Sequence, residues 1–502
     1  MTAVPSHRRV LVGGSWLIAA RTFDRLVGLI SIAILARLLK PADFGLVAIA
    51  NTIVAAIELI TAFGFDWALV RLAQPTVEDL NSAWTLRALF GVFTFATLSL
   101  LGPTAASFYH QPALQLVLMA MGVASLISSL ENIGTVYFRR EFAFHKEFLI
   151  RSGAKFVGFI VTLTWAVCYR SYWALVAGIL AIRVATIGAS YLFHPYRPRP
   201  SLSNARALLG FSSWLLFGNV VEYSRQKFAD LYVGRAYGIG TNGLFAVAGE
   251  LAIVPITEVA APINRAAYSK YTEDVRANRN LGPSYVSIAS TIWMICLPMA
   301  AGIIAVAPEA ISLLLGPQWG GAQTVLRWLA LGTVFTVMTA NTHYVYWALG
   351  HARVVAGLGA TGLLIVVLTT LVCSRVAGYP GVAFAFALAS ALLVPVNFSV
   401  LRRLASIRFS DLAGRVWRIA LGAIVMSAVL WAIFTTSGVV DAKTAMRTLA
   451  SKVAIGTVTY LLVVWMAWVA CGRPSGPESA LLEVVRQIAR RFQPRLRSGP
   501  QG

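Results

Sequence analysis

The chain has 502 residues, of which 58% are hydrophobic and 12% carry a charge, and its mean hydropathy is +0.72. This composition excludes a soluble globular protein of such length and is typical of a polytopic membrane protein. The formal net charge of +22 would suggest a nucleic-acid partner in a soluble domain. Here the basic residues lie mostly between hydrophobic runs, where they set membrane orientation, so we expect no nucleic-acid partner.

The first hydrophobic run, residues 13–39, is long enough to cross a membrane and carries Arg21, Asp24 and Arg25 near its middle. Each such charge costs about 2.5 to 3.5 kcal/mol at a helix centre on insertion scales. The three side chains therefore either neutralise one another and help helices pack, or face a water-filled cavity. We take the charged stripe as the first indication of function.

Apolar runs of about 20 residues predict fourteen membrane-spanning helices. They lie near residues 13–36, 42–63, 82–101, 113–135, 148–168, 171–193, 208–233, 241–264, 285–307, 322–349, 354–374, 381–401, 416–435 and 452–471. With an even number of spans, Lys and Arg gather in the loops on one side, which predicts that both termini are cytoplasmic. The fold class is thus an all-α polytopic membrane protein with about fourteen transmembrane helices.

The chain also resembles itself when it is shifted by 198 residues. The matches are Ser15, Trp16 and Leu17 with Ser213, Trp214 and Leu215, Arg37 with Arg235, and Gly45, Leu46, Ala48 and Ala50 with Gly243, Leu244, Ala246 and Ala248. Asp24 meets Glu222, a second carboxylate inside a span. Because each repeat holds six spans, we expect two six-helix lobes related by an axis along the membrane normal.

The predicted domains follow from this repeat. They are an N-terminal lobe at 1–193, a basic Pro-rich cytoplasmic linker at 194–207, a C-terminal lobe at 208–401, an additional helix pair at 402–471, and a basic tail at 472–502. The tail contains an amphipathic pattern that predicts either an interfacial helix on anionic lipid or a solvated regulatory segment.

A second charged stripe lies in the seventh span, with Glu222, Arg225, Lys227 and Asp230. At equivalent places in two lobes, the two stripes would face each other across a central cavity. Arg21, Arg25, Arg225 and Lys227 would suit a diphosphate there, since Arg offers a fork to phosphate oxygens and Lys a compact charge. The alternative is that the later residues of the stripe snorkel to the outer surface.

Other charged residues lie at membrane depth. Arg183, deep in the sixth span, joins the predicted substrate-binding residues, whereas Arg87, Arg151 and Lys155 lie near cytoplasmic helix ends, where we expect them to snorkel. Carboxylates that could bind a coupling proton or sodium ion, or serve as counter-ions to the arginines, are Asp24, Glu58, Glu222, Glu250 and Glu258.

Signatures of enzymes, metals and cofactors are missing from the sequence. There is no Walker lysine loop, no GxSxG and no HExxH, and the longest inner loop, near 265–283, is too short for a catalytic module. The four cysteines lack CxxC spacing and the six histidines are dispersed, so we expect no metal site and no cofactor.

Three stretches carry a resemblance to a known family: ARLLKPADFGLVAIA at 36–50, RREFAFHKEFLIRSGAKF at 139–156 and SLLLGPQWGGAQTVLRWLAL at 312–331. They are similar to the bacterial polysaccharide-export and O-antigen flippases of the multidrug, oligosaccharidyl-lipid and polysaccharide exporter superfamily. The resemblance implies a MATE-like fold, alternating access, and export of an undecaprenyl-diphosphate-linked oligosaccharide across the inner membrane. It also implies partners in a polymerase and chain-length pathway.

The sequence therefore predicts a flippase for lipid-linked oligosaccharide and not an enzyme. One alternative is a cation-coupled multidrug exporter of the same superfamily, whose cavity should be acidic or aromatic. Another is a membrane glycan polymerase or ligase, which should carry a large outer loop, whereas the longest outer loop here lies near 436–451. The charges inside the spans argue against a membrane scaffold without transport activity.

Overall fold

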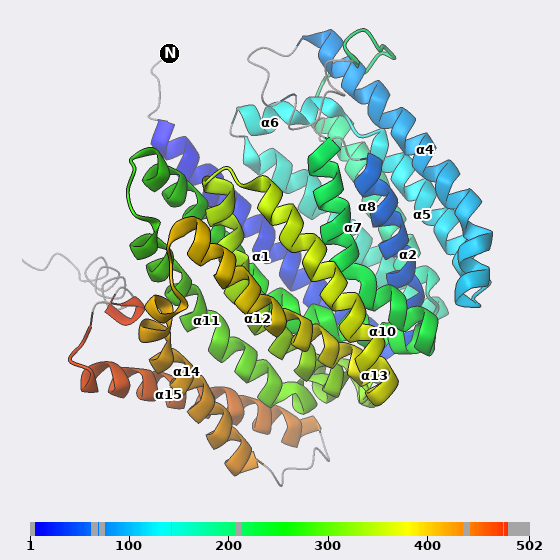
Figure 1. Ribbon diagram of the computed structural model, residues 1–502. Helices are drawn as coiled ribbons and strands as arrows, with labels where there is room; N and C mark the ends of the chain where they lie inside the picture. Colours follow the sequence, from blue (N-terminus) through cyan, green and yellow to red (C-terminus); the bar gives the residue numbers. More distant parts are fainter. Residues whose placement is uncertain are drawn as a thin grey trace, which may run out of the picture. The chain divides into compact units, whose positions relative to one another are not determined.

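The computed structural model describes residues 6–61, 69, 76–141, 143–205, 213–434, 442–474 and 476–479, and within these ranges all regular structure is helical (Figure 1). The α-helices are α1 (Ser6–Leu38), α2 (Pro41–Thr61), α4 (Val77–Tyr109), α5 (Ala113–Ser129), α6 (Val136–Arg140), α7 (Phe144–Tyr169), α8 (Trp173–Phe193), α10 (Ser213–Arg276), α11 (Leu281–Ala310), α12 (Ala322–Ala348), α13 (Ala352–Ala405), α14 (Phe409–Phe434) and α15 (Ala442–Ala470). Short 3₁₀ turns at Ile133–Thr135 and Pro317–Trp319 and a π-helix at Ile311–Leu315 complete the described part.

The two longest helices are each interrupted once. In α10 the backbone leaves helical geometry at Gly238, with φ at 83°, and in α13 it does so at Ala377 and Gly378. Both breaks fall between predicted spans, and positive φ is a conformation that glycine adopts without steric cost. Within the described residues, each of the fourteen predicted spans therefore overlaps an α-helix, with α10 and α13 supplying two each, and the all-helical polytopic fold is confirmed.

Length and composition alone support the membrane assignment for most of these helices. Nine described helices are long and apolar enough to cross a membrane, or ten if the bent pair Ala113–Ser129 and Ile133–Arg140, which meet at 61°, forms one span. Although each contains a break, α10 and α13 each count once in that number. The charged α1 and the polar α12 are not among them.

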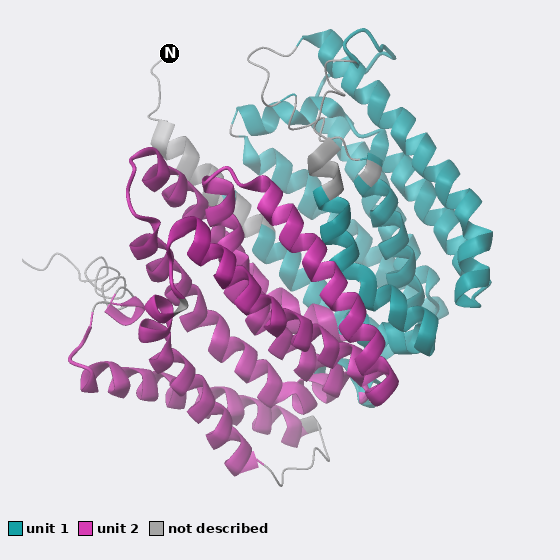
Figure 2. Ribbon diagram, in the orientation of Figure 1, with its two compact units in different colours: residues 1–247, 314–319 teal, residues 248–313, 320–502 magenta. Residues whose placement is uncertain are grey.

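The chain forms two compact units, which are coloured separately in Figure 2. Unit 1 comprises residues 1–247 and 314–319, and unit 2 comprises 248–313 and 320–502. The predicted lobe boundaries and the linker at 194–207 divide the chain elsewhere and stay predictions. The tail after Ser479, including its predicted amphipathic helix, lies outside the described residues.

In unit 1, apolar side chains from α2, α4, α5 and α8 form a buried core. Ile49, Leu98, Leu118 and Val176 represent these four helices and are almost completely buried. The polar and charged residues of α1, α2 and α10 lie outside this apolar core, and their partners are described below.

A close contact between glycines joins α2 to the second half of α10. A Cβ atom on Gly45 would lie 1.8 Å from the carbonyl oxygen of Ile239, and one on Gly243 would lie 1.8 Å from that of Pro41. The 198-residue shift places residue 41 on 239 and residue 45 on 243. The contact is therefore reciprocal, as a two-fold axis between parallel repeats would make it.

Adding a methyl group at this contact should force the two helices apart. We expect Gly45→Ala and Gly243→Ala each to destabilise the protein by about 1 to 3 kcal/mol, since overpacking strains the backbone. Thermal unfolding of the purified protein measures the effect. Gly240→Ala is the control, because a Cβ there meets no atom within 4 Å, and equal melting temperatures for all three variants would contradict the prediction.

Unit 2 has a core that mixes apolar and hydrogen-bonded polar side chains. Buried Tyr271 of α10 donates to Asn341 of α12 at 2.7 Å, and Asn341 donates to Asn264 at 2.6 Å. The Tyr346 hydroxyl donates to the Asn397 carbonyl of α13 at 2.8 Å. Satisfied polar groups of this kind fix the helices of a membrane protein in register.

The C-terminal helices α14 and α15 pack on α11 within the same unit. Ile419, Met426, Tyr460 and Val464 form an apolar layer with Met294. The Tyr460 hydroxyl donates to the Met294 carbonyl at 2.7 Å, which adds a buried hydrogen bond to this layer.

Candidate substrate-binding site

One charged residue of α1, Asp24, contacts a basic residue of α7. Lys155 donates to the Asp24 carbonyl oxygen at 2.6 Å, and its Nζ lies 3.8 Å from the Asp24 carboxylate. Arg21 and Arg25, near the middle of the 33-residue helix, have exposed side chains. Lys155 thus brings a positive charge to Asp24 from another helix, and the side chains of Arg21 and Arg25 lie at the surface of α1. The sequence predicted that Lys155 snorkels to the membrane surface, whereas in the structure it contacts Asp24 of α1.

The four charged residues of the stripe at 222–230 pair within α10. Arg225 binds Glu222 through two hydrogen bonds, of 2.9 Å from Nε and 2.6 Å from Nη2, and Lys227 lies 2.8 Å from Asp230. Each pair is three residues apart, the spacing that places side chains on one helical face. The Glu222 side chain is 39% exposed and that of Arg225 16%, so the carboxylate shields the arginine.

A hydrogen bond positions this stripe on α2. The Tyr223 hydroxyl donates to the Thr52 carbonyl at 2.7 Å. Six residues further along α2, Glu58 accepts a hydrogen bond of 2.6 Å from Ser125 of α5. The sequence predicted the acids of α2 and α10 but not these neutral partners, because hydroxyl groups on distant helices leave no pattern in the chain.

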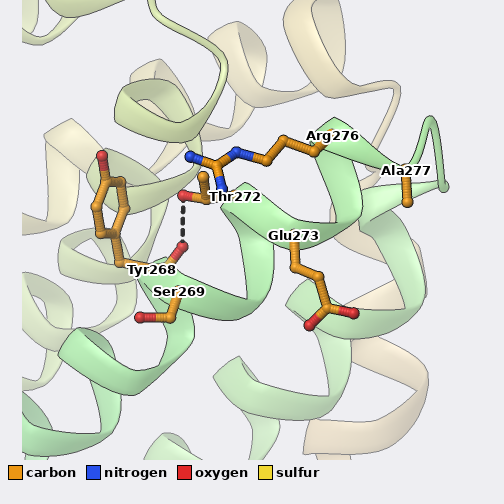
Figure 3. A pocket seen from close by; sticks show the side chains of 6 residues that line it. All are labelled: Tyr268, Ser269, Thr272, Glu273, Arg276 and Ala277. Atoms are coloured by element: carbon orange, nitrogen blue, oxygen red, sulfur yellow. Dashed lines mark hydrogen bonds between the residues drawn. The ribbon is translucent and has the colours of Figure 1, made fainter.

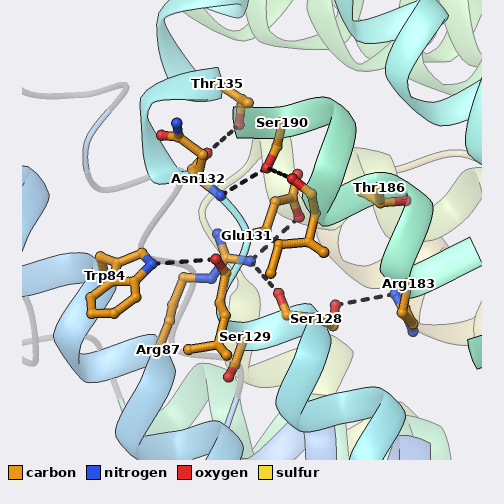
Figure 4. A network of polar contacts seen from close by, with 12 residues as sticks. Trp84, Arg87, Ser128, Ser129, Glu131, Asn132, Thr135, Arg183, Thr186 and Ser190 are labelled. Carbon is orange, nitrogen blue, oxygen red and sulfur yellow. Dashed lines mark hydrogen bonds and ion pairs between the residues drawn. The ribbon is translucent and has the colours of Figure 1, made fainter. Parts of the chain in front are cut away.

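Arg183 belongs to a polar network at the C-terminal end of α5 (Figure 4). It donates to the Ser128 hydroxyl at 3.3 Å, and Arg87 of α4 donates to the Ser128 carbonyl at 3.3 Å while lying 3.5 Å from Glu131. Trp84 donates to the Leu130 carbonyl at 3.4 Å. Donors from α4 thus satisfy carbonyl oxygens that the end of a helix leaves unpaired, and Arg183 of α8 binds a side-chain hydroxyl beside them.

The same network extends to His194, just after α8. Its Nδ1 accepts from the Tyr196 backbone N–H at 3.2 Å, and its ring stacks on Tyr137 with centroids 6.0 Å apart. Burial lowers the pKa of His194 below 6.5, and the positive charges of Lys146 and Arg197 lower it further. The carboxylate of Glu141 acts in the opposite direction and raises the pKa, but by less. The neutral ring is the form that can accept this hydrogen bond.

This geometry predicts a pH dependence of stability. Because the folded pKa lies below the unfolded one, the contribution of His194 is complete above pH 6.5 and is lost as the pH falls through the folded pKa. We expect the melting temperature to drop on acidification from pH 7 to 5, and to drop less in His194→Phe. Identical pH profiles for the two proteins would refute this role.

The remaining predicted carboxylates differ in their surroundings. Glu250 is exposed and has no hydrogen-bond or ion-pair partner among the described residues, whereas Glu258 is half-buried and in contact with its neighbours. Their predicted role in ion coupling stays a prediction, as does the substrate role of the basic residues. Among the described residues, no group of three or more His, Cys, Asp or Glu side chains is placed to hold a metal ion.

Two buried ion pairs were not predicted from the sequence. Lys452 of α15 lies 2.7 Å from Glu309 of α11, and Arg418 of α14 lies 2.9 Å from Glu478, with all four side chains at most 8% exposed. The pairs join residues 143 and 60 positions apart. Glu309 and Lys452 lie at the ends of their apolar runs, where charges are expected in loops, so no signal in the sequence indicated that they meet.

Unit 2 also has a hollow of about 500 Å³ along the last turns of α10 (Figure 3). It is lined by Tyr268, Ser269, Thr272, Glu273, Arg276 and Ala277. Glu273 is bound to Arg279 and lies 4.0 Å from Lys270, so acids and bases largely neutralise one another there. This balance does not favour an anionic ligand.

A family model described as polysaccharide biosynthesis protein matches residues 34–324, more than half of the chain. The chain belongs to this family. The predicted membership of the polysaccharide-export group is thereby confirmed. The matched range includes all the predicted site residues except Arg21, Asp24 and Arg25.

Curated relatives agree with this assignment. The lipopolysaccharide biosynthesis protein WzxC of Escherichia coli (strain K12) is 22% identical over 65% of this chain and 67% of its own length. The succinoglycan biosynthesis transport protein ExoT of Rhizobium meliloti (strain 1021) is 23% identical over 72% of this chain and 76% of its own.

Solved structures are similar to this chain in fold. The lipid II flippase MurJ in an inward closed conformation has a TM-score of 0.71 at 13% identity and covers 91% of this chain and 99% of its own. An inward-facing multidrug resistance MATE family transporter has a TM-score of 0.61 at 16% identity, over 76% of this chain and 94% of its own. The MATE-like fold is confirmed. This chain is a multi-pass membrane protein, and its curated relative ExoT is named a transport protein, in agreement with the prediction that the chain is not an enzyme.

Proposed function

We propose that this protein moves an oligosaccharide linked to undecaprenyl diphosphate across the bacterial inner membrane by alternating access. The observation that carries the proposal is the pair of exposed arginines, Arg21 and Arg25, near the middle of a helix in a transporter of the polysaccharide biosynthesis family. Cations at that depth require water or an anion. Both termini would be cytoplasmic, and a polymerase and chain-length proteins would be partners in the pathway.

The chemistry of the substrate explains the residue types. Moving an unpaired charge into hydrocarbon costs on the order of tens of kcal/mol in the Born limit, so a diphosphate needs a polar path. Guanidinium groups replace the lost hydration with charge-assisted hydrogen bonds. The Arg225 guanidinium already holds Glu222, so the diphosphate would have to exchange with this carboxylate, which favours release after transport.

A cation-coupled multidrug exporter remains the second candidate, and the exposed carboxylate of Glu250 favours it. A drug exporter would use such an acid to bind a cation or a proton. The basic residues of α1 argue for an anionic substrate instead, because they would repel the cationic amphiphiles that multidrug exporters carry.

The test is the pool of lipid-linked oligosaccharide in cells that lack the gene. The lipid is extracted, and its leaflet is assigned by the access of an added glycosidase from the outside. We expect intact oligosaccharide to accumulate on the cytoplasmic face. Unpolymerised oligosaccharide on the outer face would indicate a polymerase or ligase, and an unchanged pool would favour drug export.

A further inference from the structure

A basic hollow of about 550 Å³ lies in the elbow between α13 and α14, in unit 2. It is lined by Phe398, Ser399 and Arg402 from the last turns of α13 and by Arg408 and Ser410 at the start of α14. None of the predicted substrate or coupling residues belongs to it. Its function is therefore separate from the transport site proposed above.

The elbow that shapes this hollow is firmly built. Ser406 adopts the left-handed conformation, with φ at 56°, and its N–H donates to the Arg402 carbonyl, which ends α13. Two residues later, the Arg408 N–H donates to the Asp411 carboxylate at 3.1 Å and caps α14. Ile407 and Leu412 are buried in the apolar core beneath.

The two arginines of the hollow have no acidic partner among the described residues. The acidic residues in the ion pairs of unit 2 are bound to other basic residues. The one carboxylate in the elbow, Asp411, accepts hydrogen bonds from the Arg408 backbone and from Ser410. Arg402 and Arg408 thus present two exposed guanidinium forks to one space, beside the positive end of α14. Two forks around one hollow match the oxygens of a phosphate group.

The surface beside the hollow indicates a lipid as the source of that phosphate. Trp417, Leu421 and Ile424 follow on α14 at spacings of four and three residues, which places them on one face, and they are 47%, 39% and 66% exposed. Exposed tryptophan is typical of the headgroup level of a membrane, and the aliphatic residues beyond it suit acyl chains. A soluble phosphate has no apolar group that could contact this stripe.

We propose that the elbow between α13 and α14 binds the headgroup phosphate of an anionic glycerophospholipid. Arg402 and Arg408 hold the phosphate, and the stripe that begins at Trp417 lies along an acyl chain. By the distribution of basic residues, the site belongs to the cytoplasmic leaflet. Membrane lipid thereby becomes a specific ligand of this protein and not only its solvent.

The experiment titrates the full-length protein, purified in neutral detergent, with short-chain phosphatidylglycerol and counts bound lipids by native mass spectrometry. We expect Arg402→Gln and Arg408→Gln each to weaken binding about tenfold, as the loss of one charge-assisted hydrogen bond does. Arg403→Gln is the matched control, because it removes the same charge from the neighbouring position, outside the hollow. Its affinity should stay within about twofold of the wild-type value by the same reasoning.

Three results would overturn the proposal. Equal weakening by all three variants would mean a diffuse basic surface. Equal affinity for phosphatidylcholine would remove the role of net headgroup charge. Full displacement by millimolar inorganic phosphate would identify a soluble phosphate as the ligand. Trp417→Ala provides an independent readout, since it should weaken lipid binding without altering any weak binding of inorganic phosphate.

Discussion

Replacing Arg225 by Glu is expected to abolish export while the protein stays inserted and folded. The substitution removes a guanidinium from the proposed diphosphate path and sets a second carboxylate beside Glu222. A lost charge-assisted hydrogen bond alone is worth about 1.5 to 3 kcal/mol, or roughly 10- to 100-fold in affinity, and the added repulsion increases the effect. Outer-leaflet oligosaccharide in cells that carry only the variant measures the loss.

Two further variants separate substrate binding from the local ion pair. Glu222→Gln breaks the same pair but keeps Arg225, so we expect it to retain export and to bind the lipid-linked substrate more tightly. Arg447→Glu reverses an exposed charge on α15, away from the proposed path, and should leave export unchanged. Normal export by Arg225→Glu, or equal loss in Glu222→Gln, would rule out the role of Arg225 in holding the diphosphate.

The largest loss of stability is expected from Lys452→Ala. The substitution leaves Glu309 charged and 98% buried without its cation, and removing one member of a buried pair costs about 3 to 5 kcal/mol. The Lys452 ammonium also donates to the Ala305 carbonyl at 3.0 Å and lies 5.5 Å from the Phe434 ring centre, so α11, α14 and α15 all lose a contact. Denaturant unfolding of the purified protein measures the change.

The double variant Glu309→Leu/Lys452→Met tests whether the uncompensated charge causes that loss. Replacing both members of a buried pair by apolar groups is often neutral, so most of the stability should return. Lys443→Ala, at an exposed position of α15, is the control and should change little. If Lys452→Ala unfolds at the same denaturant concentration as Lys443→Ala, the pair does not hold the helices together.

The positions of the helices could be predicted because the membrane imposes a length and an apolar composition on each of them. The glycine-containing breaks near 238 and 378 even fall where the sequence separates two spans. Helix ends outside the hydrocarbon were less predictable. For example, α4 begins at Val77, several residues before its predicted span, because Thr76 and Asp79 form a capping box.

Partners in the candidate site were predictable only when they shared a helix. Glu222 and Arg225 are three residues apart, and that spacing indicates a pair. Asp24 and Lys155 lie 131 residues apart, and Lys452 and Glu309 lie 143 apart. Such contacts depend on which helices become neighbours, and a single sequence carries no signal of that choice.

The reciprocal contact between Gly45 and Gly243 has a consequence for the origin of the chain. A surface whose residues meet their own counterparts is isologous, the type of interface that two identical subunits form. A protein of one repeat could have made the same contact with a second copy of itself before gene duplication joined the two. In such an ancestor a single glycine codon would have supplied both sides of the interface, whereas the present chain must maintain two.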